Sequence, residues 1–457
     1  MNTRTEAESR RSRKVALASM IGTTVEWYDV IIYAQTAGLV LATLFFAPVA
    51  GDLGLLLTFG SVGVTFIFRP LGAILSSFFG DRIGRKPVMV ATLLLMGIAT
   101  TLIGLLPTHA SIGVLAPIIL VLLRILQGIA VGGEWGAAAL LAVESAATRT
   151  RGRQGSFPQL GVPMGLLLAS GVLALVAGVI APGEAYLEWG WRIPFLFSIV
   201  LVAIGFWVRR SVDETPVFLD LAKKRRQTKV PLATLLKRYW LVVVLAGVLF
   251  AGNNASGQML AGGFLASYAT DSARAVPLLP AEVSLATLIG SVMWLVSTYV
   301  AGGLSDRFGR RPVFVIGYAA LALAALPFFW LSELGSFALL TVGCVIFAVG
   351  LGISYGAIPA WYAELFPADV RYAGVSLSYT LGNVLGGALS PLIAVALVQS
   401  TGSITTVGLY LIVMCALSIV AAFLLRDRTR IDLSIDNAEE QRRGITVFDR
   451  NDSPARV

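Results

Sequence analysis

The stretch Asp81-Arg-Ile-Gly-Arg-Lys-Pro-Val88 has a second copy later in the chain, Asp306-Arg-Phe-Gly-Arg-Arg-Pro-Val313. Two further charged residues repeat at nearly the same spacing: Glu144 and Arg151 are matched by Glu364 and Arg371. Self-similarity at a long, fixed period indicates that one structural unit occurs twice. The sequence therefore predicts two halves of like orientation, each built on the same plan.

The composition around these copies is that of a membrane protein. Hydrophobic residues make up 56% of the 457-residue chain and charged residues only 13%, and the mean hydropathy is +0.81. One buried core could not absorb so much apolar surface, whereas about 20 apolar residues cross a bilayer as one helix. Twelve segments qualify: 15–46, 53–79, 88–106, 112–143, 157–180, 191–208, 239–268, 283–304, 313–331, 337–362, 373–398 and 404–425. No cleavable signal peptide is expected, because the first apolar run is too long for one.

The basic residues predict the orientation. If the N-terminus is cytoplasmic, all but four of the 35 Lys and Arg residues fall in cytoplasmic segments; the exceptions are Arg69, Arg124, Arg192 and Arg274. The positive-inside rule therefore predicts that both termini are cytoplasmic. The net charge of +9 is then a topology signal and does not imply nucleic acid.

These features divide the chain into five parts. We expect a cytoplasmic N-terminal tail (1–14), a first six-helix half (15–210), a cytoplasmic central loop (211–238), a second six-helix half (239–425) and a cytoplasmic tail (426–457). The last part is short and charged and has no heptads, so we expect it to be disordered. Cys344 and Cys415 fall inside expected helices and indicate packing, with neither a disulfide nor a metal site.

Four charged residues lie at mid-membrane depth. Glu26 and Asp29 fall roughly 15 to 20 Å into the first helix at 1.5 Å per residue, and Arg69 and Arg124 lie at a similar depth in the second and fourth. An ionised side chain there costs about 3 kcal/mol, so we expect the two acids and the two arginines to pair internally.

Charged residues at mid-membrane depth occur in the first half only. The positions in the second half that correspond to Arg124 and Glu134 are Cys344 and Ser354. A buried ion cluster that only fixes helix packing is one explanation. A proton-binding site beside a neutral, polar wall explains the asymmetry better.

Several short motifs are shared with a known family. They are Val25-Glu-Trp-Tyr-Asp29, Phe68-Arg-Pro-Leu-Gly72, Arg124-Ile-Leu-Gln-Gly128, Gly132-Gly-Glu-Trp-Gly136, Gly190-Trp-Arg-Ile-Pro-Phe195, Glu214-Thr-Pro216, Glu364-Leu-Phe-Pro367 and the two loop copies quoted above. In these motifs the chain resembles the major facilitator superfamily, and within it the metabolite:proton symporters, over nearly its whole length. One departure is Ser77, where the family's loop motif opens with glycine; Gly302 keeps that glycine in the second copy.

The resemblance implies an all-α membrane protein with twelve transmembrane helices in two halves. It implies a secondary active transporter, not an enzyme, that takes up a small organic acid together with protons by alternating access. It further implies a monomer in the bacterial inner membrane, with no cofactor and no metal. The alternatives are a symporter of a zwitterionic osmolyte such as proline or betaine, and a uniporter or proton-driven exporter.

The charged residues at the inner membrane face are expected to form a cytoplasmic gate. The candidates are Asp81, Arg82, Arg85, Glu134, Glu144, Arg151, Asp306, Arg307, Arg310, Glu364 and Arg371. Gly84 and Gly309 provide the tight turns between them. The alternative is that these charges only set topology and form weak surface pairs worth roughly 0 to 1 kcal/mol each.

The coupling hypothesis centres on Asp29 and Arg124, with Glu26 as the other possible proton carrier and Arg69 as its neighbour. An ionised Asp29 would occupy Arg124, and a protonated Asp29 would release that guanidinium for a substrate carboxylate. Candidate substrate-binding residues are Arg124, Tyr33, Gln127, Gln159, Asn253, Asn254, Gln258, Tyr379 and Asn383. For any of the amides in the second half, hydrogen bonding between helices is an equally good explanation.

Overall fold

The structure, a computed structural model, describes residues 2–46, 48, 54–83, 85–210, 231–261, 263–270 and 276–449. Twelve helices in these parts are long and apolar enough to cross a membrane. This agrees with the twelve segments expected from hydropathy.

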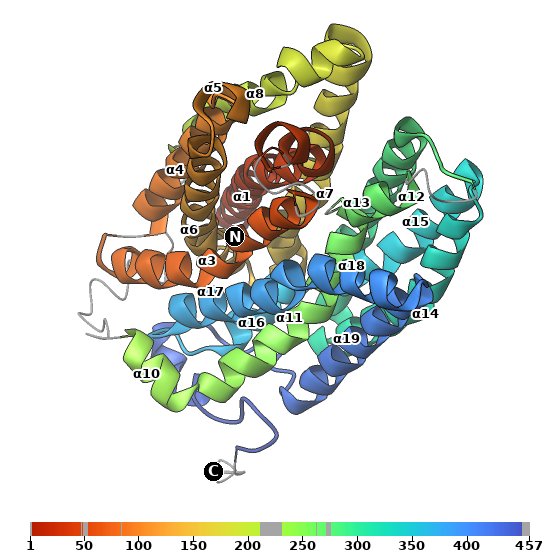
Figure 1. Cartoon of the computed structure of the whole chain (residues 1–457). Helices are drawn as coiled ribbons and strands as arrows, with labels where there is room; N and C mark the ends of the chain where they lie inside the picture. Colours follow the sequence, from red (N-terminus) through yellow and green to blue (C-terminus); the bar gives the residue numbers. More distant parts are fainter. Residues whose placement is uncertain are drawn as a thin grey trace, which may run out of the picture.

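The first half consists of α1 to α8. Its helices are α1 (Asn2–Thr36) with its π-helical extension η1 (Ala37–Phe46), α3 (Gly54–Ile83), α4 (Arg85–Leu105), α5 (His109–Ile112), α6 (Leu115–Glu144), the short η3 (Thr148–Thr150), α7 (Arg151–Leu175) with η4 (Val176–Ile180), η5 (Tyr186–Gly190) and α8 (Arg192–Arg210). In this half α1 packs against α7 and α8, and α6 packs against α3 and α4. Figure 1 shows these helices grouped together, in red to yellow.

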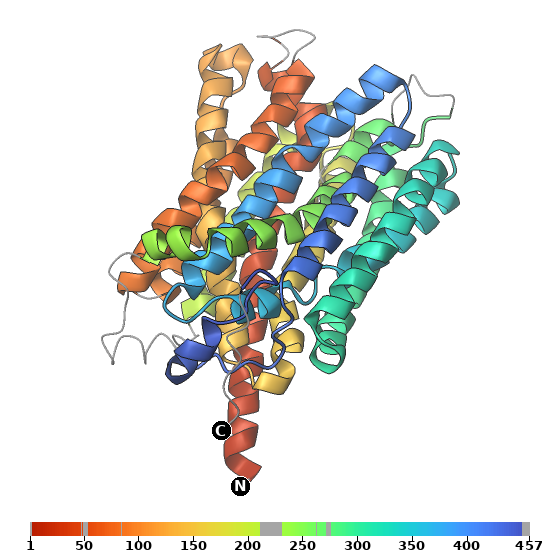
Figure 2. The same ribbon diagram turned by 90° about the horizontal axis from the view of Figure 1, so that it is seen from below.

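The second half repeats the arrangement. It consists of α10 (Pro231–Arg238), α11 (Trp240–Ala261), α12 (Phe264–Ala269), α13 (Pro280–Phe308), α14 (Arg310–Glu333), α15 (Phe337–Ile353), α16 (Ile358–Leu365), α17 (Arg371–Gly382) with η6 (Asn383–Ala388), α18 (Ser390–Thr401) and α19 (Thr405–Leu424). Of the expected central loop, residues 211–230 lie outside the described part, and the remainder forms α10. The start of α1 and residues 426–449 lie at the same end of the bundle, which we call the terminal end (Figure 2).

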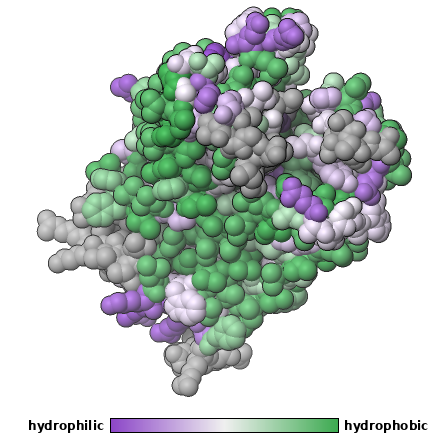
Figure 3. Space-filling view, in the orientation of Figure 1, coloured by the Kyte–Doolittle hydropathy of each residue, from purple (hydrophilic) through white to green (hydrophobic). Residues whose placement is uncertain are grey.

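Large apolar side chains cover the outside of the bundle. Trp207 and Leu323 are more than three-quarters exposed, and Figure 3 shows hydrophobic side chains over most of the visible face. A surface of this kind is stable against lipid and not against water. The polar residues are instead gathered inside and at the ends, which is the pattern that a membrane-spanning bundle requires.

The two halves meet along a few helices. α7 packs against α13, and α17 with η6 packs against α3 and α6. At the terminal end, α7 and α13 approach so closely that a Cβ atom on Gly302 would lie 2.7 Å from the carbonyl oxygen of Gly152. Small residues permit such an approach between membrane helices. The glycine retained in the second loop copy therefore lies at the contact between the halves.

The turn between α13 and α14 has the conformation that the loop motif predicts. Gly309 has φ of +98°, a backbone region that residues with a Cβ atom rarely adopt. The equivalent Gly84 lies outside the described residues.

Candidate functional site

Asp29 and Arg124 are connected through two intervening side chains. Arg124 donates from Nη1 to Gln127 Oε1 (2.7 Å), Gln127 donates from Nε2 to Thr100 Oγ1 (2.7 Å), and Thr100 donates to Asp29 Oδ2 (2.8 Å). All four are fully buried in the first half, on α1, α4 and α6. Every donor points in the same direction, from the arginine to the carboxylate. We call this chain of hydrogen bonds the relay.

The relay corrects one expectation. Within the described part of the chain Asp29 and Arg124 make no direct ion pair, because Thr100 and Gln127 lie between them. Gln127 was a candidate from the sequence, but Thr100 was not. One threonine in an apolar helix gives no signal, since its hydroxyl can donate to its own backbone; for Thr100 the Met96 carbonyl oxygen, 3.0 Å away, is such an alternative acceptor.

The Arg124 guanidinium has further contacts on its own side of the molecule. It lies over the ring of Tyr33, 3.7 Å from the centroid, and its Nε approaches the carbonyl oxygen of Ser61 at 3.5 Å. The Tyr33 hydroxyl is hydrogen-bonded to Ser61 Oγ (2.6 Å). Tyr33 therefore positions the guanidinium through a cation–π contact.

Arg69 reaches from the first half into the second. Its Nη1 donates to Asn383 Oδ1 (3.1 Å), and the same oxygen accepts a hydrogen bond from Asn254 Nδ2 (2.7 Å). The guanidinium lies over Phe66 at 4.2 Å, and the buried Glu26 is close enough to interact with it electrostatically. Two of the candidate amide side chains of the second half, Asn383 and Asn254, thus lie beside Arg69 of the first half.

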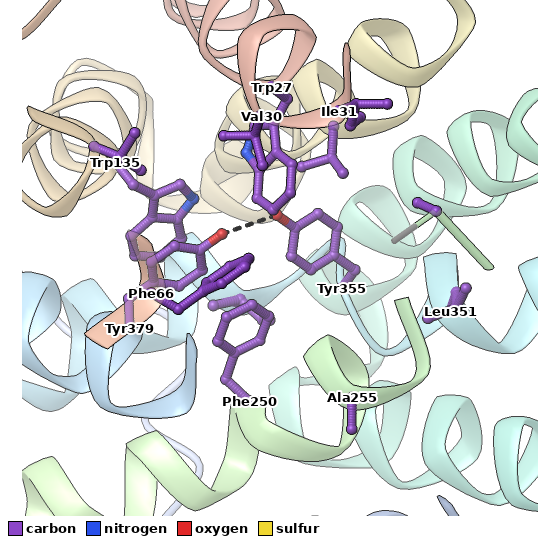
Figure 4. Packing of buried hydrophobic residues seen from close by; sticks show 14 of the residues in the cluster. Trp27, Val30, Ile31, Phe66, Trp135, Phe250, Ala255, Leu351, Tyr355 and Tyr379 are labelled. Carbon is purple, nitrogen blue, oxygen red and sulfur yellow. Dashed lines mark hydrogen bonds between the residues drawn. The ribbon is translucent and has the colours of Figure 1, made fainter. Parts of the chain in front are cut away.

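A group of aromatic rings fills the space beside Arg69. Tyr379 is stacked between Trp135 (centroids 3.5 Å apart) and Phe250 (4.4 Å), and its hydroxyl meets that of Tyr355 at 3.1 Å. Figure 4 shows these rings together with Phe66 and Trp27, and the hydrogen bond between the two tyrosines. Because Trp135 belongs to α6 and Tyr379 to α17, the stack joins the halves near the centre of the molecule.

The remaining candidates differ in their surroundings. Gln159 accepts a hydrogen bond from Trp135 Nε1 (2.7 Å) and so borders the aromatic group. Asn253 donates to Leu351 O and Ser354 Oγ, both within the second half, as the helix-packing explanation requires. Gln258 is buried on α11.

At the terminal end, the second loop copy forms a buried ion cluster. Arg310 binds both carboxylate oxygens of Glu364, at 3.0 and 2.9 Å, and also binds Asp306 at 2.9 Å. Asp306 in turn accepts hydrogen bonds from the backbone N–H groups of Gly152 and Arg153 (2.7 and 2.9 Å). These N–H groups belong to the second and third residues of α7, in the first turn, where a negative charge is stabilised by the helix dipole. The cluster therefore binds the other half of the molecule.

Other gate candidates also connect the halves. Glu144 forms a buried ion pair with Arg371 at 3.2 Å, and Arg151 donates to the carbonyl oxygen of Ile431. Glu134 is fully buried on α6, whereas Arg307 is exposed. The side chains of the first-copy candidates lie outside what the structure describes; these are Asp81, Arg82 and Arg85.

The C-terminal tail is folded where we expected disorder. Residues 426–449 include two short helical segments, η7 (Ile435–Asn437) and α20 (Ala438–Gln441), and they lie against the terminal end of the bundle (Figure 2). Leu433, Ile445 and Gln441 are buried there. Composition failed to predict this because the tail binds charged groups of the bundle and does not need a core of its own.

These features agree with what comparison of the whole chain finds. A model of the Major Facilitator Superfamily matches residues 19–384, and a second match covers residues 254–451. The chain belongs to the Major Facilitator Superfamily. It is therefore a membrane transporter and not an enzyme, and its two halves are those of that fold.

Relatives within the superfamily are metabolite carriers. The chain is 41% identical to the inner membrane metabolite transport protein YhjE of Escherichia coli (strain K12), with 91% of this chain and 94% of the relative covered. It is 38% identical to the shikimate transporter of the same organism (92% and 96% covered) and 30% identical to its proline/betaine transporter (91% and 83%).

A solved structure shares the superfamily fold. The proton:xylose symporter XylE bound to 6-bromo-6-deoxy-D-glucose is similar to this chain with a TM-score of 0.75 and 18% sequence identity. The alignment covers 93% of this chain and 98% of that chain.

Proposed function

We propose that this protein is a proton-coupled symporter that carries a small organic acid across the bacterial inner membrane by alternating access. The relay is the observation that supports this best. It joins a fully buried carboxyl group to a fully buried guanidinium through two uncharged side chains, all in one half of the molecule. Buried ionisable groups inside a membrane protein commonly mark proton pathways.

The relay suggests how a proton on Asp29 affects Arg124. While Asp29 is ionised, the Thr100 hydroxyl donates to it. Once Asp29 is protonated, its own O–H can donate to Thr100, whose hydroxyl hydrogen then turns to the Met96 carbonyl oxygen, 3.0 Å away. The chain of hydrogen bonds persists, but its negative end has become neutral. The positive charge of Arg124 is then uncompensated, and an entering anion restores the balance.

Alternating access also needs an end of the bundle that closes and opens. Three contacts between the halves support the terminal end in that role: Asp306 with the start of α7, Glu144 with Arg371, and Tyr372 with the carbonyl oxygen of Gly133 (2.9 Å). Every one of them must break if the halves separate there. We expect the transporter to act as a monomer, with this end in the cytoplasm.

The relatives favour an organic acid over a zwitterion. The similarity to the shikimate transporter is higher than that to the proline/betaine transporter, at 38% against 30% identity. The test is uptake by proteoliposomes with an imposed pH gradient. The labelled probes are shikimate, succinate, citrate, proline and glycine betaine.

We expect a carboxylate to accumulate only when the outside is more acidic, and a protonophore to abolish the accumulation. Accumulation of betaine or proline alone would favour the osmolyte alternative. Uptake that equilibrates and ignores the pH gradient would identify a uniporter. Thr100→Val, which cannot hydrogen-bond, should reduce accumulation more than it reduces exchange, because it interrupts the relay.

A further inference from the structure

One edge of the Arg69 guanidinium has no hydrogen-bond partner among the described residues. Its Nη1 donates to Asn383, but Nε and Nη2 are buried and have no hydrogen-bond partner among the described residues. The side chain as a whole is fully buried. A buried, unpartnered charged donor is costly and indicates a group that the site is built to receive.

The two atoms in question form the edge that holds a carboxylate. Nε and Nη2 point the same way, and together they match the two oxygens of a carboxylate. Arg310 of this protein uses the same two atoms to bind Glu364, at 3.0 and 2.9 Å. Arg124 does not offer this edge, because its Nε is already directed at the carbonyl oxygen of Ser61.

The position of this edge suits a transported ligand. Arg69 belongs to α3 of the first half. Asn383, which accepts a hydrogen bond from Arg69 Nη1, and Asn254, which donates to the same Asn383 oxygen, belong to the second. A ligand bound here would touch both halves, so that its binding could bias their relative position. Beside it lie the rings of Phe66, Trp27 and Tyr379, which form an apolar wall (Figure 4).

The surroundings restrict the ligand further. Phe66 and Trp27 each receive the Arg69 guanidinium on one face, and Tyr379 already has two stacking partners, so these rings do not form a cage around a second cation; a ligand ring would meet their remaining faces and edges. Glu26 interacts with the same guanidinium and so repels any carboxylate bound here; the free edge of Arg69 compensates one carboxylate, and a second would have no such partner. Both a quaternary ammonium group and a second acid group are therefore disfavoured.

We propose that Arg69, and not Arg124, binds the substrate carboxylate, and that the substrate is a cyclic monocarboxylic acid whose ring lies against this aromatic wall. The proposal rests on the proposed function, since it assumes that the cargo is an organic acid. It assigns Asn383 and Asn254 as positioning residues, which hold the guanidinium and link it to the second half.

The test is equilibrium binding to the purified full-length transporter, without a pH gradient, so that a failure of proton coupling leaves the result unaffected. The probes are shikimate, its uncharged methyl ester, succinate and glycine betaine. For the wild-type protein we expect shikimate to bind at least about tenfold more tightly than each of the others, because only it offers one carboxylate and one ring. Equal binding of the ester, or preferred binding of betaine or succinate, would overturn the proposal.

A matched pair of variants locates the anchor. Arg69→Lys keeps the positive charge and loses the pair of donors, Nε and Nη2, that matches a carboxylate. We expect its affinity for shikimate to fall by about tenfold or more. Arg124→Lys also keeps the charge. Because Arg124 acts through the relay, we expect this variant to lose less shikimate affinity than Arg69→Lys and to lose accumulation driven by a pH gradient. The reverse order would restore Arg124 as the anchor. Asn383→Ala should lower the affinity for shikimate although the charge at position 69 is unchanged. Thermal unfolding of each variant checks that it is folded.

The folded tail supports a second, independent inference. Gln441 is fully buried, and its side chain makes four hydrogen bonds: it accepts from Ala368 N and Arg371 Nη2 (both 3.0 Å) and donates to the carbonyl oxygens of Asp432 and Ser434 (both 2.7 Å). The tail then returns to the bundle, where Val447 N donates to Leu424 O at the end of α19, at 3.0 Å. Gln441 thus stabilises both the internal fold of the tail and the attachment of the tail to the bundle.

The tail binds the arginines that join the halves. Arg371, the partner of Glu144, also donates to the carbonyl oxygen of Leu433 (3.2 Å), and Arg151 of the first half donates to that of Ile431. Arg430 donates to the backbone oxygen of Asp306 (3.2 Å). We infer that residues 426–449 are a clamp that stabilises the closed state of the terminal end and must detach before this end opens.

The clamp is tested with spin labels on the full-length protein, one at Arg149→Cys in the first half and one at Phe308→Cys in the second, both exposed positions. Gln441→Ala should raise the ratio of open to closed terminal ends by about tenfold, because it removes hydrogen bonds to a buried charged group. Glu439→Ala, an exposed position on the same short helix, is the control and should change nothing. An unchanged label distance in Gln441→Ala, with the tail detached by the criterion of limited proteolysis, would show that the tail does not stabilise closure.

Discussion

Replacing Gly302 by alanine should open the terminal end of this transporter. A Cβ atom on Gly302 would lie 2.6 Å from the Cβ of Ser156 and 2.7 Å from the carbonyl oxygen of Gly152, whereas ordinary contacts begin at 3.4 Å. Neither neighbour can rotate away, since one is backbone and the other is fixed to it. α7 and α13 must therefore separate by about 1 Å or deform. Overpacking of this kind costs about 1 to 3 kcal/mol.

The cost falls on the closed state alone, because the contact exists only when the halves meet at this end. The ratio of closed to open molecules should therefore fall by about 5- to 150-fold. The neighbouring Gly303 is a matched control, since a Cβ atom there would meet nothing within 4 Å. Spin-label distances across the terminal end should lengthen in Gly302→Ala and stay unchanged in Gly303→Ala. If both variants retained the wild-type distance and transport rate, the close approach of α7 and α13 would not be a determinant of closure.

Three further outcomes are expected. Asp306→Asn should slow transport, because it weakens the charge interaction with α7 by about 0.3 to 1 kcal/mol, while substrate affinity in detergent changes less than about threefold; a large loss of affinity would contradict this. Asp29→Asn mimics a permanently protonated acid, so it should permit exchange of labelled for unlabelled substrate and abolish accumulation driven by a pH gradient; the same separation in Glu26→Gln alone would reassign the proton to Glu26. The pKa of Asp432 in the tail is lowered, first by the backbone N–H of Ser434 and further by the Ser434 hydroxyl and by Arg151 and Arg371. Its contribution to docking of the tail is therefore present above the ordinary carboxyl pKa of about 3.9 and is lost as the pH falls through the lower, folded value. Limited proteolysis should find the tail equally protected between pH 5 and 8 and increasingly accessible as the pH is lowered below about 3.9.

The sequence by itself determined the membrane-spanning architecture. Twelve apolar segments and the repeated loop are local properties of the chain, and a bilayer leaves a long apolar segment no stable alternative to a helix. It also identified the four charged residues at mid-membrane depth, since an ionisable group inside an apolar run is conspicuous without any knowledge of its partners.

Which side chains meet was decided by the tertiary structure. Thr100, Gln127 and Arg124 come from two helices that are adjacent only after packing, and Arg69 finds Asn383 more than 300 residues away in the chain. The order of the tail depended on contacts of the same kind, because Gln441 is buried only when Ala368 and Arg371 are already in place. Hydrogen bonds act over about 3 Å, and helix rotations of a fraction of a turn make or break them, so that spacing along the sequence could place these residues at one depth but could not choose their partners.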